Sequence, residues 1–111
     1  MTDLILHWDD RPAECVCRAI KAERLRQEQR KAEGRFTHTC ADPDPGAMTD
    51  AEKLTVLVEE VGEVAREVLT QDGRRLARDT EGTREALRTE LVQVAAVAVA
   101  WVEALDTETS A

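Results

Sequence analysis

The stretch TELVQVAAVAVAWVEAL, residues 89–105, decides the architecture of this chain. From Leu91 to Val102 every side chain is apolar except Gln93. The run is about 12 residues long, well short of the roughly 18 to 20 that a membrane-spanning helix requires. We therefore expect a buried helix and no membrane partner. Because a buried amide needs a hydrogen-bond partner, Gln93 is expected to face a polar group.

A first helix is predicted upstream from the residues that suit its two ends. Pro12 fits the first turn, where its missing N–H costs nothing, and Gly34 fits a C-terminal cap. These signals predict a helix over 12–33. The following segment, 34–48, contains two prolines and two glycines and is expected to be a loop.

A capping box marks the start of the second predicted helix. Thr49 is followed three residues later by Glu52, which predicts a helix from position 50 to about 71. The third helix is expected over roughly 83–106, with a frayed tail at 107–111. No stretch alternates apolar and polar residues in the way a strand does, so the predicted fold class is all-α, an antiparallel helical bundle.

Length and composition indicate a single domain that is completed by oligomerisation. The chain has 111 residues, of which 42% are hydrophobic and 34% charged, and we expect one domain over 1–111 with its core at about 12–106. A helix that is apolar on all sides is buried on all sides. Two other helices cannot surround the third, so we expect a second copy of the chain to do so.

Charge and cysteine content exclude other classes of protein. The net charge of −8 argues against nucleic-acid binding, which relies on Lys and Arg to neutralise phosphates. Segment 18–35 differs from the rest of the chain because it is basic, with seven basic side chains and only three acidic ones. Three cysteines, an odd number, without a signal peptide indicate a reduced cytoplasmic protein.

Helical periodicity assigns faces to the second and third helices. On the third helix, the expected core stripe consists of Leu87, Leu91, Val94, Ala95, Ala98, Val102 and Leu105. Another side of that helix carries Glu90, Gln93, Val97 and Trp101. On the second helix, one apolar stripe consists of Leu54, Leu57, Val58, Val61, Val64, Ala65, Val68 and Leu69.

Acidic residues form a separate row on the second helix. Glu60, Glu63 and Glu67 share one flank, and like charges three or four residues apart destabilise a helix unless they are compensated. Glu90 and Gln93 repeat the spacing of Glu60 and Glu63 on the third helix. Facing pairs of this kind build metal sites in helix bundles, and Mg²⁺ prefers oxygen ligands. A solvated acidic face, with Gln93 bonded across an interface, explains the spacing equally well.

Two motifs resemble those of the MazG-like proteins of the all-α nucleoside triphosphate pyrophosphatase superfamily. The run KLTVLVEEVGEVAREV, 53–68, contains the family pattern E-E-x-G-E at 59–63, and Gly62 inside a helix suggests close packing there. A second pattern, E-L-x-D, is similar to 90–93, with Gln93 in place of Asp. Upstream, ERLRQEQRKAEGRFTH, 23–38, is similar to the family's nucleotide-approaching segment. The resemblance covers about 23–105.

The resemblance implies a Mg²⁺-dependent enzyme that hydrolyses a nucleoside triphosphate to the monophosphate and pyrophosphate, as a homodimer or dimer of dimers. It implies metal ligation by Glu60, Glu63, Glu90 and Gln93. Of these, the three carboxylates are also the implied catalytic residues, together with Glu59, which would orient or deprotonate the attacking water. The implied substrate-binding residues are Gln27, Lys31, Phe36 and His38.

Three other interpretations stay open at the level of sequence. The chain can be a catalytically impaired homologue that acts as a nucleotide-binding or oligomeric helical module, or a helical assembly protein with no ligand. Cys15, Cys17, His38 and Cys40 are of the types that ligate zinc. Residues two apart on a helix point about 200° apart, however, which disfavours a metal shared by Cys15 and Cys17.

Overall fold

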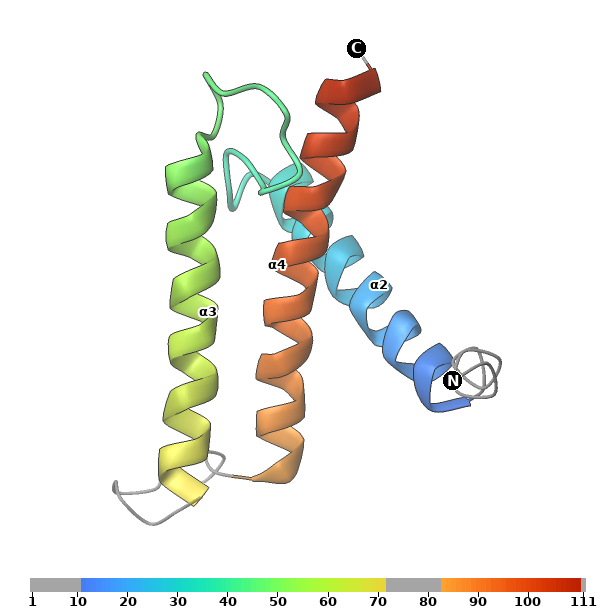
Figure 1. Ribbon diagram of the computed structural model, residues 1–111, viewed down its shortest axis with the longest axis vertical. Coiled ribbons are helices and arrows are strands. Elements are labelled where there is room, and N and C mark those ends of the chain that lie inside the picture. Colours follow the sequence, from blue (N-terminus) through green and yellow to red (C-terminus); the bar gives the residue numbers. More distant parts are fainter. Residues whose placement is uncertain (1–10, 72–82, 111) are drawn as a thin grey trace.

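The computed structural model describes residues 11–71 and 83–110, and all of the regular structure in these ranges is helical. Helix α2 spans Arg11–Ala32, α3 spans Asp50–Gln71 and α4 spans Arg84–Ser110. Helices α3 and α4 lie side by side and antiparallel, and α2 crosses α4 obliquely (Figure 1). The predicted all-α class is confirmed.

The helix boundaries agree with the sequence prediction except at the end of α4. Helix α3 has the predicted bounds, and α2 begins and ends one residue early. Helix α4 is longer than predicted, because it continues beyond residue 106 to Ser110. No Pro or Gly interrupts this segment, and the Thr107 hydroxyl donates to the Glu103 carbonyl oxygen at 2.8 Å. Ala111 lies outside the described residues.

Both predicted caps are present. Gly34 has φ +80°, and its N–H donates to the Lys31 carbonyl while Arg35 N–H donates to the Arg30 carbonyl. This is the Schellman pattern, in which glycine takes a left-handed conformation. At the start of α3 the Thr49 N–H donates to Glu52 Oε1 at 3.1 Å and the Glu52 N–H donates to Thr49 Oγ1 at 3.2 Å, which is a capping box.

Helix α4 is the central element of the chain. It packs against α3 on one side and α2 on another, whereas no Cα of α2 comes within 8 Å of α3 among the described residues. The buried hydrophobic residues are small or of medium size: Cys40, Ala96, Val97, Ala100 and Ala104. The described part of one chain therefore encloses only a small apolar core.

The side of α4 that faces the chain interior is not the one predicted. Within one chain Leu91 and Val102 are 50% and 53% exposed, and Leu105 is also exposed. The buried residues lie instead on the side of Gln93, Val97 and Trp101. Both sides of α4 are largely apolar, so hydrophobic periodicity alone cannot decide between them.

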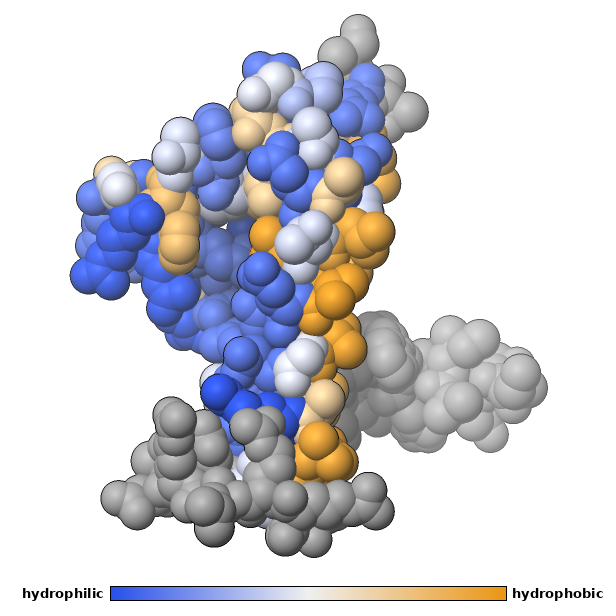
Figure 2. Space-filling model, turned by 90° about the vertical axis from the view of Figure 1, so that its left-hand side faces the viewer, coloured by the Kyte–Doolittle hydropathy of each residue, from blue (hydrophilic) through white to orange (hydrophobic). Residues whose placement is uncertain are grey.

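Helix α3 likewise turns its polar flank inward. Lys53 is 2% exposed and Glu67 is 4% exposed, whereas Val58 is 60% exposed. Leu54, Val61 and Val68 are also exposed. Figure 2 shows hydrophobic residues in a band along one side of the molecule. The predicted close packing at Gly62 is not found among residues 11–71 and 83–110, because a Cβ there would meet none of their heavy atoms within 4 Å.

Candidate functional site

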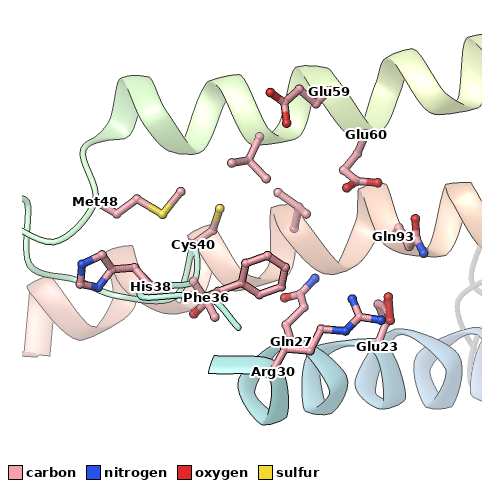
Figure 3. Close-up of a pocket in the computed structure, with 13 residues that line it drawn as sticks. Glu23, Gln27, Arg30, Phe36, His38, Cys40, Met48, Glu59, Glu60 and Gln93 are labelled. Carbon is pink, nitrogen blue, oxygen red and sulfur yellow. The ribbon is translucent and has the colours of Figure 1, made fainter. Parts of the chain in front are cut away.

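A pocket of about 330 Å³ lies among α2, α3, α4 and the loop that follows α2. Apolar and acidic side chains lie toward different ends of this pocket (Figure 3). One end is mainly apolar and is lined by Phe36, Cys40, Met48, Val56 and Val97. The other end is acidic and is lined by Glu23, Glu60 and Gln93, and Glu59 lines the pocket from α3 between the two ends (Figure 3). The pocket thus combines an apolar surface with a concentration of negative charge.

The Gln93 amide joins two carboxylates at the acidic end. The two ends of a glutamine amide are assigned from their hydrogen-bond partners, and here the partners require the reverse of the orientation drawn in Figure 3. The Gln93 NH₂ group then donates to Glu90 Oε2 at 2.8 Å and to Glu60 Oε2 at 3.2 Å. Gln93 thus faces polar groups, as the sequence predicts, and in this orientation its amide links α3 to α4.

These carboxylates lie in an environment that disfavours their charge. Burial raises the pKa of Glu60 above its ordinary value, and Glu90 and Glu63 raise it further. Burial likewise raises the pKa of Glu90, followed by the charges of Glu63 and Glu67, which Arg66 partly opposes. Negative charge is therefore concentrated here beyond what the neighbouring side chains neutralise, and a bound cation would relieve it.

The four predicted metal ligands do not all occupy the pocket. Glu60 and Gln93 line it, whereas Glu63 and Glu90 do not. Glu63 forms an ion pair with Arg66, in which Glu63 Oε2 lies 2.6 Å from Arg66 Nη2. Across residues 11–71 and 83–110, no three Asp, Glu, His or Cys side chains already form a metal-binding group. Mg²⁺ is usually held by one or two carboxylates together with phosphate and water, and Glu60 and Glu90 supply that number.

Only some of the predicted substrate-binding residues line the pocket. Gln27, Phe36 and His38 line the pocket. Lys31 does not, because its ammonium is paired with Asp42 Oδ1 at 2.7 Å. Arg30 was not among the predicted substrate-binding residues, and it is the only Arg or Lys among the described residues that line the pocket. Its guanidinium has no carboxylate within ion-pair distance in the described part of the chain.

Arg30 has a recognisable signal in the sequence. Residues 23, 27 and 30 are spaced four and three apart and so share one face of α2, and all three line the pocket. Lys31 lies about 100° further round the helix and faces the loop instead. Around the helix, Arg30 lies about 20° from Glu23 and Lys31 about 80° from it, so spacing favours Arg30 only once Glu23 is known to line the pocket.

Asp42 was also missed, and it holds the loop that shapes the apolar end. Its carboxylate accepts hydrogen bonds from Lys31 at 2.7 Å and from the Thr39 N–H at 3.0 Å, and His38 Nδ1 lies 3.4 Å from it. Its backbone carbonyl accepts a hydrogen bond from the buried Lys53 ammonium at 2.7 Å. Asp42 thus connects α2, the loop and α3. No sequence motif indicates such a set of tertiary contacts.

The candidate zinc site is not formed among the described residues. Cys15 and Cys17 are exposed on α2, whereas Cys40 is buried in the loop. Burial raises the pKa of the Cys40 thiol, and nearby Lys53 and Arg24 oppose this shift. Cys40 therefore contributes a neutral thiol to the pocket wall.

Comparisons with protein families, with curated proteins and with solved structures found no match to this chain. No helix in the described part of the chain has the length and apolar character needed to cross a membrane.

Proposed function

We propose that this chain is a Mg²⁺-dependent nucleoside triphosphate pyrophosphohydrolase that releases a nucleoside monophosphate and pyrophosphate. The observation that carries the proposal is the two-part pocket, in which an apolar end with an aromatic ring adjoins an acidic end where burial and neighbouring carboxylates raise the pKa of Glu60. A nucleotide has a matching division between a flat base and a charged, metal-binding phosphate chain. The motifs at 59–63 and 90–93 and their resemblance to MazG-like proteins support the same reaction.

Glu60 and Glu90 are the side chains that would hold the metal ion. They approach from α3 and α4, and the Gln93 amide holds their carboxylates near each other. When bound, Mg²⁺ neutralises phosphate charge and lowers the barrier to attack at phosphorus. Glu63 can join the site only by giving up its ion pair with Arg66.

The remaining pocket residues bind and orient the substrate. Phe36 is half-exposed beside the cavity, so its ring can stack on a base. Arg30 can donate two hydrogen bonds to one phosphate group. Glu59 also lines the pocket, and its role in this proposal is to orient the attacking water. The water oxygen forms a bond to the α-phosphorus, the bond to the bridging oxygen breaks, and Glu59 accepts the water proton as pyrophosphate leaves.

A screen of nucleoside triphosphates for pyrophosphate release, with and without Mg²⁺, tests this proposal. We expect release only with the metal, and we expect Glu59→Gln to lower kcat about 100-fold or more because a positioned base contributes about that factor. Glu85→Gln is the matched control, because Glu85 is exposed on α4 outside the pocket. Absence of release from every triphosphate would contradict the proposed reaction.

A second candidate is a nucleotide-binding module without catalysis. It is favoured by two observations, the amide at Gln93 in place of a carboxylate and the engagement of Glu63 by Arg66. The two candidates differ in one measurement. A rise in melting temperature with nucleotide, without pyrophosphate release, would identify the binding module, whereas release would identify the enzyme.

We also infer that the chain assembles with copies of itself. Within one chain α3 exposes Leu54, Val58, Val61 and Val68 while it buries Lys53 and Glu67. Soluble monomers rarely expose a continuous apolar band of this kind, and such bands mark association sites. A homodimer or dimer of dimers that covers the band would supply the apolar core that one chain lacks.

A further inference from the structure

The amide of Gln27 is held in one orientation by Arg24. The Arg24 Nη1 group donates to Gln27 Oε1 at 2.7 Å, which occupies the acceptor end of the amide. Arg24 is itself 9% exposed. Its Nε donates to Glu103 Oε2 at 3.0 Å, and its Nη2 lies 2.9 Å from Glu28. Two carboxylates thus fix the guanidinium, and the guanidinium fixes the amide.

The opposite end of the Gln27 amide is available to a ligand. Gln27 lines the pocket, and no described residue accepts a hydrogen bond from its NH₂ group. In the view of Figure 3 the amide lies between the Phe36 ring and the carboxylates of Glu23 and Glu60. The Gln27 amide therefore presents a hydrogen-bond donor, and not an acceptor, to the pocket.

We propose that Gln27 is a specificity-determining residue that recognises a carbonyl oxygen on the edge of the base and rejects an amino group. This inference rests on the proposed function. In the proposed function the phosphate chain has its own partners, namely Arg30 and the metal ion that the acidic end would hold. The donor near Phe36 therefore faces the base. A keto base accepts the hydrogen bond, whereas an amino group would place donor against donor and leave both unpaired. Uracil and hypoxanthine nucleotides are then preferred over cytosine and adenine nucleotides.

Arg24 acts in this scheme as a positioning residue, because it does not line the pocket. Without its guanidinium, the Gln27 amide is free to rotate by half a turn and to present its oxygen instead. The preference for a keto base then depends on Arg24 although no ligand touches it. A purely structural role for Arg24 would change stability but not this preference.

Calorimetric binding of α,β-methylene analogues tests the inference, because these analogues block cleavage between the α- and β-phosphates. We expect the wild-type chain with Mg²⁺ to bind the UTP analogue about tenfold more tightly than the CTP analogue, and the ITP analogue about tenfold more tightly than the ATP analogue. One hydrogen bond gained or left unpaired corresponds to roughly this factor.

Three variants sharpen the test. Gln27→Glu keeps an acceptor for Arg24 but replaces the donor with an acceptor, so the preference is expected to reverse toward CTP and ATP. Gln27→Met removes both groups, and Arg24→Met removes the donor that holds the amide, so each is expected to bring both affinity ratios close to one. Gln29→Glu is the matched control on the exposed side of α2, and it should leave the ratios unchanged.

The outcomes separate this inference from the proposed function. Binding of all four analogues with equal affinity by the wild-type chain would overturn the role of Gln27 and leave the proposed function intact. An equal loss of affinity for all four in Gln27→Glu would also overturn it, since this would assign Gln27 to the phosphates or the sugar. Failure of the wild-type chain to bind any nucleotide would overturn both.

Discussion

The amide of Gln93 bridges two carboxylates that belong to different helices. Its NH₂ group donates to Glu60 and Glu90, and the pKa of each carboxyl group is raised first by burial and then by neighbouring carboxylates. A donor between two anions stabilises the metal-free chain, and a carboxylate at the same position would destabilise it. The amide therefore favours the metal-free state, and a carboxylate would favour the metal-bound one.

We predict that Gln93→Asp lowers the Mg²⁺ concentration needed for half-maximal activity. The substitution adds a third carboxylate to the metal site and removes two hydrogen bonds, so the metal-free chain should lose about 1–2 kcal/mol of stability. Mg²⁺ titrations of activity and of the melting temperature measure both effects. Gln29→Asp, on the exposed side of α2, is the control. Unchanged metal dependence in Gln93→Asp would remove Gln93 from the site.

Glu60→Gln should abolish Mg²⁺-dependent turnover without harming the fold. The pKa of Glu60 is raised above its ordinary value of 4.5, so the folded chain favours the protonated form. The stability that this gives is present below pH 4.5 and is lost as pH rises through the folded pKa. Since Gln mimics the protonated acid, the variant should gain a few tenths of a kcal/mol at pH 7.

Urea unfolding of the wild type and Glu60→Gln, at pH 7 and near pH 4, measures this difference. The gain at pH 7 is expected to vanish near pH 4, where the wild-type carboxyl group is also protonated. A variant with full Mg²⁺-dependent turnover would remove Glu60 from the metal site. A loss of stability at pH 7 would contradict the repulsion that we infer among the carboxylates.

At the scale of the elements, the loop between α2 and α3 depends on Asp42. Burial would raise the pKa of this carboxyl group, but hydrogen bonds from Lys31 and the Thr39 N–H, together with the charges of Lys31 and His38, lower it below 3.8. Its contribution to stability is therefore present above pH 3.8 and is lost as pH falls through the folded pKa. The apolar end of the pocket is built from this loop, so Asp42 affects both folding and ligand binding.

We predict that Asp42→Asn lowers the free energy of unfolding by about 1–2 kcal/mol at pH 7, because it removes a charge-assisted hydrogen bond to Lys31. Chemical denaturation at pH 7 and at about pH 3 measures the change, which should shrink at the lower pH. Asp44→Asn is the matched control, since Asp44 is exposed in the same loop. Equal effects of the two substitutions would show that Asp42 does not hold the loop.

Element boundaries could be predicted from the sequence because local chemistry decides them. Thr49 and Glu52 cap α3 through contacts within one turn, and Gly34 ends α2 through its own backbone conformation. The direction in which each helix faces depends on distant residues instead. Both sides of α4 are apolar, so the sequence pattern could not show that Leu91 would be exposed and Val97 buried.

The same difference between local and distant contacts decides which residues of the candidate site could be predicted. Glu60 and Gln93 lie in motifs whose spacing places them on facing helices, and the structure brings them together. Arg30 and Asp42 take their positions from the packing of α2 and the loop, which involves contacts between distant parts of the chain. Local spacing alone therefore favoured Lys31, although Asp42 holds that ammonium away from the pocket.

At the scale of the whole molecule, the faces of α3 and α4 require a partner. One chain buries charged residues on α3 and exposes aliphatic ones, which reverses the usual arrangement of a soluble helix. The arrangement is reasonable if the buried charges belong to a site and the exposed aliphatic residues belong to an interface. The site and the assembly are then built on opposite faces of the same helices.

We predict that the chain in solution has at least twice the mass of the 12.4 kDa monomer. Val58→Glu should dissociate it, because burying one unpaired carboxylate in an apolar interface costs several kcal/mol. Light scattering at micromolar concentration measures the mass. Thr55→Glu adds the same charge to the same helix about 60° from Val58, on an exposed position outside the apolar stripe, and should leave the mass unchanged. A wild-type monomer at that concentration would show that α3 and α4 keep their apolar faces in water, and the inferred assembly would be wrong.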